Sequence, residues 1–169
     1  MENKLTHLLQ IGIIVDDLDR VVKNYEEIGM TGWEITYLEN TEYLADLTLN
    51  GKSYPDGSKI LKVALLQAYG LEIEIIEPIL DCVYKEWLEK HGPGLHHVAM
   101  KLNDGYDETL DWAKAKNGKD PWVRGIAVGG MLDFSYLDLR NELGLIVECY
   151  KNPTPGKDGL PFNMNKKGE

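Results

Sequence analysis

The chain has 169 residues, of which 43% are hydrophobic and 27% charged, and it carries a formal net charge of −10. This length suits one domain with a real core, while the scarcity of arginine (Arg20, Arg124 and Arg140) argues against nucleic-acid binding and against a phosphate clamp. No apolar run is long enough for a membrane span, no secretory signal opens the chain, and Cys82 and Cys149 lack metal or redox spacing, so we expect a cytoplasmic protein with reduced thiols and no membrane partner.

The first half of the chain combines one amphipathic helix with apolar strands. The helix is expected from about Leu18 to Ile28, with Asp16 and Asp17 as its cap and Gly29 at its end. Alternating or continuous apolar residues predict the strands Leu8–Val15, Trp33–Leu38, Tyr43–Leu49, Ile60–Gln67 and Leu71–Glu77.

The second half repeats this order after a linking helix, expected from about Cys82 to Lys90. The turn Gly92-Pro93-Gly94 precedes a strand at His96–Leu102, and a helix is expected at about Asp107–Lys116. The remaining strands are predicted at Trp122–Val128, Met131–Leu139 and Leu145–Tyr150.

The two halves look like versions of each other. Gln10 in the first strand corresponds to His97 in the fifth, and Glu74 near the end of the first half corresponds to Glu148 near the end of the second. The first half is longer, and the loop-like stretch Glu39–Lys59 can hold the extra residues. This duplication predicts an α+β fold of two βαβββ modules in one domain. The expected parts are module 1 at about 6–80, a linking helix at about 81–91, module 2 at about 92–153 and an extended tail at 154–169.

Strand alternation separates several polar residues into inward and outward groups. Neighbouring residues of a strand point to opposite faces, so only one of His96 and His97 should face a cavity, and His96 should pack on the outer face or against the helix. Glu72 shares the face of Glu74, either as a second cavity acid or as a surface residue at the strand end, and we favour the surface. Glu74 and Glu148 are costly to bury unless paired or metal-bound, and the alternative for each is a position on a rim.

Together these segments resemble the vicinal oxygen chelate (glyoxalase/bleomycin resistance/dioxygenase) superfamily, and within it the methylmalonyl-CoA epimerase and glyoxalase I-like branch. The likeness covers about Leu8 to Pro153. It is carried by Ile11–Leu18, by Gly92–Ala99, and by Tyr136–Asp138 with Gly144–Glu148. The resemblance implies that the two modules form a cup-shaped mixed sheet and that the protein is a homodimer.

The resemblance also implies a metal site, because four inward side chains of the cup bind one divalent ion in this superfamily. By position these ligands are Gln10, Glu74, His97 and Glu148. Members most often have histidine at the first position, although glyoxalase I enzymes with glutamine there are known. One imidazole and three oxygen ligands suit zinc, nickel, cobalt, manganese or iron.

The implied activity is that of a metal-dependent isomerase, epimerase or lyase that transfers a proton through an enolate. Glu148 or Glu74 would serve as the base, and the substrate would be a small 2-oxo, hemithioacetal or acyl-thioester compound. Methylmalonyl-CoA epimerase adds a second glutamate on the third strand, and the matching residue here is Val63, which counts against a strict epimerase.

Two other functions of the superfamily are less well supported by the residues. Extradiol dioxygenases use two histidines and one carboxylate on iron, whereas Gln10 replaces the first histidine here and Glu74 adds a fourth position. A metal-free small-molecule (drug) binding protein of the bleomycin-resistance type would lack the ligand set altogether. Tyr136 or Phe134, and Trp33, could line the cup, depending on the register of the strands.

Overall fold

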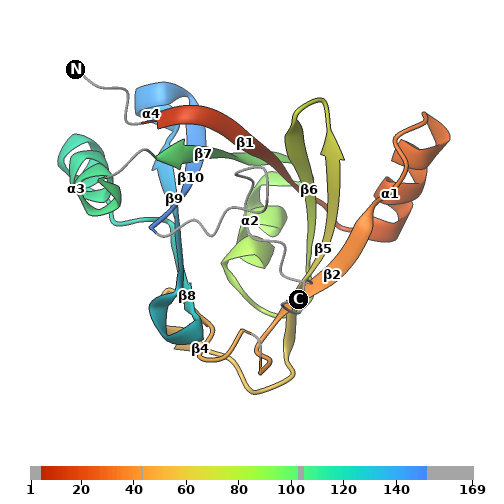
Figure 1. Cartoon of the computed structure of the whole chain (residues 1–169), viewed down its shortest axis with the longest axis horizontal. Helices are drawn as coiled ribbons and strands as arrows, with labels where there is room; N and C mark the ends of the chain where they lie inside the picture. The colour runs from red at the N-terminus through yellow and green to blue at the C-terminus, as the bar shows by residue number, and fades with distance from the viewer. Residues whose placement is uncertain (1–4, 43, 103–104, 152–169) are drawn as a thin grey trace.

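A ten-stranded mixed sheet curls into a half-barrel in the computed structural model, which describes residues 5–42, 44–102 and 105–151 (Figure 1). The strand order across the sheet is β2-β5-β6-β1-β7-β10-β9-β8-β3-β4. The strands are β1 (Leu5–Ile14), β2 (Glu34–Glu39), β3 (Thr48–Leu49), β4 (Lys52–Ser53), β5 (Lys59–Ala68), β6 (Leu71–Pro78), β7 (Gly94–Leu102), β8 (Val123–Ala127), β9 (Leu132–Leu139) and β10 (Leu145–Tyr150). The helices are α1 (Leu18–Glu27), α2 (Val83–His91), α3 (Tyr106–Asn117) and α4 (Arg140–Leu143), with a 3-10 turn at Val128–Gly130.

The expected pair of βαβββ modules is confirmed. β1, α1, β2, β5 and β6 form the first module, and β7, α3, β8, β9 and β10 form the second. The modules join where β1 runs antiparallel to β7, and each of these strands has a parallel neighbour from its own module, β6 and β10 respectively. α1 and α3 lie on the outer side of the curled sheet, whereas the linking helix α2 lies within the curl (Figure 1).

Local chemistry explains why α1 begins and packs as the sequence predicts. Asp17 is the N-cap, and its side chain accepts a 2.9 Å hydrogen bond from the backbone N–H of Arg20. Leu18 and Val22 are buried in a cluster that includes Ala64 from β5. The helix therefore covers the outer side of module 1 with its apolar face.

The stretch between β2 and β5 crosses to the second module and closes one side of the cup (Figure 1). β3 pairs antiparallel with β8, and the backbone N–H of Val128 donates to the carbonyl oxygen of Ala45 at 2.6 Å. Leu44, Leu47 and Leu49 are buried in the core cluster that fills the concave side of the sheet. The extra residues of the first half thus lie where the sequence predicts, and they pack against module 2.

The predicted strand at Tyr43–Leu49 is wrong for most of its length. Only Thr48–Leu49 is a strand, and residues 44–46 form a turn. Leu44 and Leu47 are three residues apart, a spacing that lets a turn bring both side chains into the core where a strand would separate them. Tyr43 and the expected tail at 154–169 lie outside the described residues. Among the described residues, no helix is long and apolar enough to cross a membrane.

Candidate metal centre

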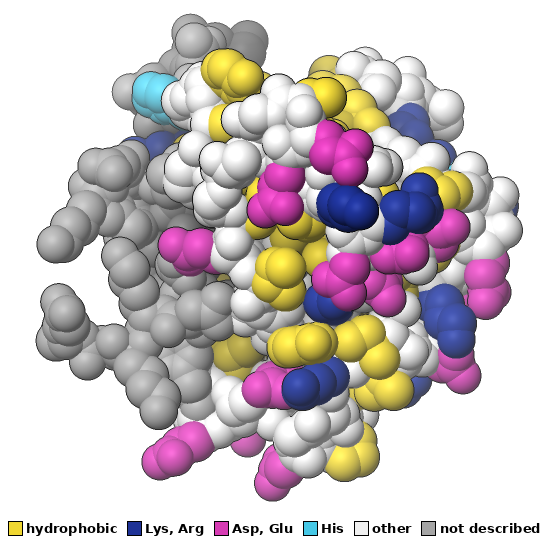
Figure 2. Space-filling model, turned by 90° about the vertical axis from the view of Figure 1, so that its right-hand side faces the viewer, with side chains coloured by type: hydrophobic (Ala, Val, Ile, Leu, Met, Phe, Trp, Pro, Cys, Tyr) yellow, Lys and Arg dark blue, Asp and Glu magenta, His cyan; other side chains and the backbone are white. Residues whose placement is uncertain are grey.

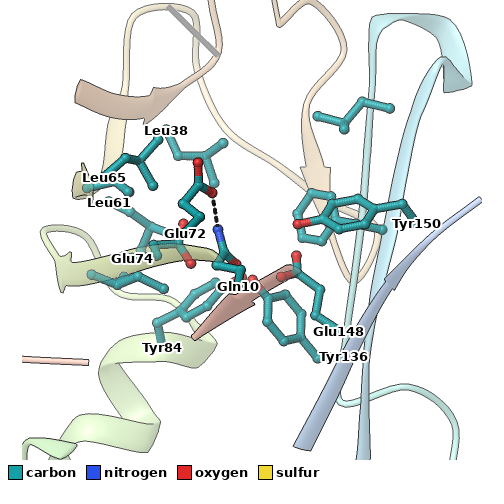
Figure 3. Close-up of a pocket in the computed structure, with 14 residues that line it drawn as sticks. Gln10, Leu38, Leu61, Leu65, Glu72, Glu74, Tyr84, Tyr136, Glu148 and Tyr150 are labelled. Carbon is teal, nitrogen blue, oxygen red and sulfur yellow. Dashed lines mark hydrogen bonds between the residues drawn. The ribbon is translucent and has the colours of Figure 1, made fainter. Parts of the chain in front are cut away.

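The concave side of the sheet contains a cavity of about 60 Å³ between β5 and β6 of the first module and β9 and β10 of the second (Figure 3). Glu72 and Glu74 lie on one side of it and Glu148 on the other, with Gln10 between them. The lining consists of Gln10, Leu38, Leu61, Val63, Leu65, Glu72, Glu74, Ile76, Tyr84, Leu132, Phe134, Tyr136, Glu148 and Tyr150.

Strand register places the four expected ligands on adjacent strands. β6, β1, β7 and β10 are neighbours in the sheet and carry Glu74, Gln10, His97 and Glu148 respectively. Glu74 lies opposite Gly12, two residues after Gln10, and Glu148 lies opposite the residue two positions after His97. The match between the two copies inferred from the sequence therefore holds in the paired strands.

The imidazole of His97 is the point on which these side chains converge. Its Nε2 lies 3.1 Å from Gln10 Oε1, 3.2 Å from Glu148 Oε2 and 3.5 Å from Glu74 Oε2. All four residues are buried. Within the described residues, the Oε2 atoms of Glu74 and Glu148 are buried without any hydrogen-bond donor.

Glu72 fixes the orientation of the Gln10 amide. Gln10 Nε2 donates to Glu72 Oε1 at 2.6 Å, and Gln67 Nε2 donates to Glu72 Oε2 at 2.6 Å (Figure 3). Because the Gln10 nitrogen is used in this way, its oxygen faces His97. The expectation that Glu72 lies on the surface is wrong, since only 5% of it is exposed. Two amide donors from within the protein allow the carboxylate to be buried.

His96 contacts the other nitrogen of His97. The two Nδ1 atoms lie 3.0 Å apart, so one ring donates and the other accepts. His96 Nε2 is buried without a conventional partner, and its ring packs 4.8 Å from both Trp87 and Trp122. Coordination of a metal through His97 Nε2 would need a lone pair on that atom. The ring proton of His97 would then lie on Nδ1 and be donated to His96 Nδ1, with the proton of His96 on Nε2.

A β-bulge explains how both histidines reach this position. Gly12 pairs with His97 and Ile13 pairs with Leu95, which leaves His96 as the extra residue of β7. His96 packs against Trp87 of α2, as expected, but its ring also meets that of His97. In a regular strand the two neighbouring rings would point to opposite faces, so the sequence did not predict the contact between His96 and His97.

The carboxyl groups of the site have altered acidity. The pKa of Glu74 is well above its ordinary value because of burial and because of the nearby charges of Glu148 and Glu72. Burial raises the pKa of Glu72 to about 7, although the amide of Gln10 opposes this shift. Burial also lowers the pKa of His96 to about 2, so this ring stays neutral. Ionisation of these carboxyl groups is therefore disfavoured unless a positive charge lies close to them.

The donor types of the site, one imidazole nitrogen and three oxygens, suit a divalent cation. Donor atoms that each lie about 2.1 Å from one ion are about 3.0 to 3.5 Å from one another, and the separations around His97 Nε2 fall in this range. As the side chains stand in residues 5–42, 44–102 and 105–151, no group of three or more His, Cys, Asp or Glu is placed to hold a metal ion. The fit therefore rests on the chemistry of the donors and on the Oε2 atoms of Glu74 and Glu148, which have no hydrogen-bond partner among the described residues.

Other cavity residues differ in how well the sequence identified them. Phe134 and Tyr136, which the sequence offered as alternatives, both line the cavity. Trp33 does not, because it packs on Tyr25 at 5.3 Å beside α1. Tyr84 of α2 and Tyr150 of β10 also line the cavity and were not singled out. Nothing in the sequence placed a linking helix inside the cup, whereas Tyr150 shares the strand face of Glu148, a signal that could have identified it. The sequence signal for Glu72 was its shared strand face with Glu74.

Comparison with known proteins identifies the family. Residues 9–132 match the model of the Glyoxalase/Bleomycin resistance protein/Dioxygenase superfamily. The chain belongs to this superfamily. A search of curated proteins found no match.

Several solved structures share the fold at low sequence identity. Methylmalonyl-CoA epimerase from Mycobacterium tuberculosis has a TM-score of 0.55 at 17% identity, over 92% of this chain and 93% of its own. A hypothetical protein from Bacillus halodurans C-125 has a TM-score of 0.57 at 19% identity, over 89% and 96%. A variant of Streptomyces coelicolor methylmalonyl-CoA epimerase, in complex with 2-nitronate-propionyl-CoA, has a TM-score of 0.53 at 21% identity, over 88% and 98%. These similarities establish the glyoxalase-like fold.

Proposed function

We propose that this chain is a metal-dependent isomerase, epimerase or lyase that transfers a proton at a carbon beside two vicinal oxygens of a small substrate. The observation that carries the proposal is the convergence of acceptors on His97 Nε2. Gln10 Oε1, Glu74 Oε2 and Glu148 Oε2 lie within 3.5 Å of it, and the two carboxylate oxygens have no donor among the described residues. Gln10, Glu74, His97 and Glu148 would hold the ion.

Different residues of the cup would have different roles in such a reaction. A bound divalent ion would polarise the substrate oxygens and so acidify the adjacent carbon. Glu148 or Glu74 would accept the proton and return it, since both carboxylates lie beside the cavity. The apolar wall formed by residues such as Leu61 and Phe134 would limit the access of water.

A metal-free drug-binding protein is the second candidate, and a dioxygenase is less well supported. In a metal-free drug-binding protein, buried carboxylate oxygens without hydrogen-bond donors would cost free energy, because no cation would be present to satisfy them. A dioxygenase of this superfamily needs a second histidine, and Gln10 occupies that position with its oxygen toward His97. Both points favour the proton-transfer reaction.

We do not propose that the protein is a strict methylmalonyl-CoA epimerase. The epimerases are relatives in fold, and one of them was solved with methylmalonyl-CoA. The position that carries their additional base corresponds to Val63, which lines the cavity here as an apolar residue. A homodimer and a cytoplasmic location stay predictions.

Solvent deuterium exchange tests the proposed reaction directly. Protein loaded with Zn²⁺, Ni²⁺ or Co²⁺ is incubated in D₂O with methylmalonyl-CoA or the methylglyoxal–thiol adduct, and exchange is followed by NMR. We expect metal-dependent exchange that is lost in Glu148→Gln and retained in Glu89→Gln, since Glu89 is exposed on α2. Oxygen consumption with a catechol, or tight binding of an aromatic drug by metal-free protein without turnover, would contradict the proposal.

A further inference from the structure

A second hollow, the α2 recess, lies beside the linking helix and shares no lining residue with the cavity of the cup. Its volume is about 110 Å³, and residues of α2, β7, α4 and β10 line it. We propose that the α2 recess binds a small monocarboxylate with a short apolar group, and that His96 and Arg140 donate hydrogen bonds to the two oxygens of the carboxylate.

A buried nitrogen without a partner gives the first argument. His96 lines the α2 recess and is only 4% exposed, and its Nε2 has no hydrogen-bond partner among the described residues. Its other ring nitrogen already lies 3.0 Å from His97 Nδ1, so Nε2 is the atom of His96 that is left for a ligand. A buried polar atom without a partner costs free energy, which a ligand in the recess would recover.

Arg140 determines which chemical group fits, because a guanidinium donates hydrogen bonds and accepts none. It lines the same recess, lies 5.0 Å from the centre of the Trp87 ring, and donates from Nε and Nη2 to Asp138 at 2.8 Å and 3.0 Å. These contacts hold the guanidinium in place, and it has further N–H groups for a ligand. A ligand that meets both Arg140 and His96 Nε2 must therefore offer acceptors, and a carboxylate offers two on one carbon. No Asp or Glu is among the described residues that line the recess, and hydrogen bonds to a charged group are the stronger kind.

The rest of the α2 recess is apolar and small. Val98 and Ile146 belong to its lining, together with Leu95 and Leu145, which remain 60% and 37% exposed. An apolar group on the ligand would remove part of this surface from water and so favour binding through the hydrophobic effect. A volume of about 110 Å³ is below that of a typical drug-sized site, so a short branched chain fits best.

Isovalerate and isovaleramide form a matched pair of probes, because they share one branched chain and differ only in the charged oxygen that the amide lacks. Each is titrated by calorimetry into metal-free protein at neutral pH, so the result does not depend on the function proposed above. The natural protein is compared with Arg140→Met, which removes the charge on the exposed side of the recess. Arg20→Met is the control, since Arg20 is paired with exposed Asp16 beside α1. Imidazole ¹H–¹⁵N NMR of the natural protein follows His96 Nε2 in the same titration.

We expect isovalerate to bind the natural protein with a Kd of about 1 mM and isovaleramide to bind about tenfold more weakly. The affinity for isovalerate should fall about tenfold in Arg140→Met and change less than about twofold in Arg20→Met, and the His96 Nε2 signal should shift as isovalerate is added. No binding of isovalerate at millimolar concentrations, an equal affinity for isovaleramide, an unchanged affinity in Arg140→Met, or a His96 signal that does not move would each overturn this inference. The proposed reaction in the cup would still stand, since its own test uses metal-loaded protein.

Discussion

At the scale of single residues, Gly12 determines whether His97 can occupy its place. Gly12 pairs with His97 across β1 and β7, and the imidazole lies over the glycine. A Cβ at this position would overlap the ring atoms of His97. The first strand of the cup therefore needs a residue without a side chain two positions after Gln10.

The substitution Gly12→Ala should displace His97 and lower the affinity for a divalent ion at least tenfold, measured by competition with a fluorescent chelator. The control is Gly125→Ala, where an added Cβ would overlap the ring of Phe134 instead. Both variants should lose stability, but only Gly12→Ala should lose metal affinity. Equal metal affinity in the two variants would contradict the role of Gly12.

His96 acts on the site through His97. The substitution His96→Phe removes the hydrogen-bond partner of His97 Nδ1, and we expect metal affinity to fall about 10-fold to 100-fold, as for other partners of ligating histidines. His91 offers a matched control, since it stacks on Trp87 at 3.9 Å but is exposed. Titration calorimetry should show little change in His91→Phe, and a similar loss in both variants would argue for a general packing effect.

The sequence predicted the four converging residues but not the contacts that orient them. The repeat and the strand order place Gln10, Glu74, His97 and Glu148 at matching positions of the two modules, and the register puts them on adjacent strands. Their role as metal ligands stays a prediction. The contact between His96 and His97 depends on a β-bulge, and a bulge leaves little mark on an apolar pattern. The burial of Glu72 depends on Gln67 from the neighbouring strand, and single-strand alternation contains no information on such a partner.

At the scale of elements, the insertion between β2 and β5 holds module 1 against β8. Asn50 contributes to this link, since its backbone N–H donates to the carbonyl oxygen of Arg124 at 2.8 Å and its side-chain oxygen accepts from the N–H of Arg124 at 2.8 Å. Its side-chain nitrogen also donates to the carbonyl oxygen of Trp122 at 2.9 Å. The insertion is thus a structural part of the cup.

The apolar anchor of the insertion should be important for stability. Leu47 is fully buried in the core of the cup, so Leu47→Ala should lower the free energy of unfolding by about 2 to 5 kcal/mol in urea titrations. Ile35 of β2 is 46% exposed, and Ile35→Ala should cost clearly less. A small effect of Leu47→Ala, equal to that of Ile35→Ala, would show that the insertion packs loosely.

The regular elements were predictable because their apolar residues follow one period. α1 has its cap and its buried face where the sequence places them, and β6 (Leu71–Pro78) extends one residue beyond the expected strand. The insertion was not predictable in the same way, since Leu44 and Leu47 are buried through a turn. Its pairing with β8 joins segments far apart in the chain, which local patterns do not encode.

At the scale of the whole molecule, charge is distributed without a continuous basic surface on the face that carries α1. Figure 2 shows acidic, basic and apolar side chains interspersed over the described part of this face. The net charge of −10 also argues against binding to nucleic acid, which is itself negatively charged. The absence of a nucleic-acid partner stays a prediction from charge.

Burial of Glu72 should make the stability of the metal-free protein depend on pH. Its pKa is raised from 4.5 to about 7, so the folded state binds more protons than the unfolded state between these values and loses stability as the pH rises. Relative to the natural protein, Glu72→Gln should gain roughly 2 kcal/mol in free energy of unfolding between pH 5 and pH 8.

Urea titrations at several pH values, with chelator present, measure this difference. His96 has a lowered pKa and acts in the opposite direction, since it destabilises the folded state as the pH falls, but it is present in both proteins and cancels. Glu89→Gln on the exposed side of α2 should show no such gain. A stability difference between Glu72→Gln and the natural protein that does not vary with pH would contradict the burial of an ionisable Glu72.

The central claim is that the cup binds one divalent ion through Gln10, Glu74, His97 and Glu148. Elemental analysis of protein purified without chelator, together with titration of the metal-free form, measures the content and the affinity. We expect about one transition-metal ion per chain, with loss of the ion in His97→Ala and in Glu148→Gln but not in His91→Ala. Full metal content in both His97→Ala and Glu148→Gln, or no uptake of any divalent ion by the natural protein, would contradict the account.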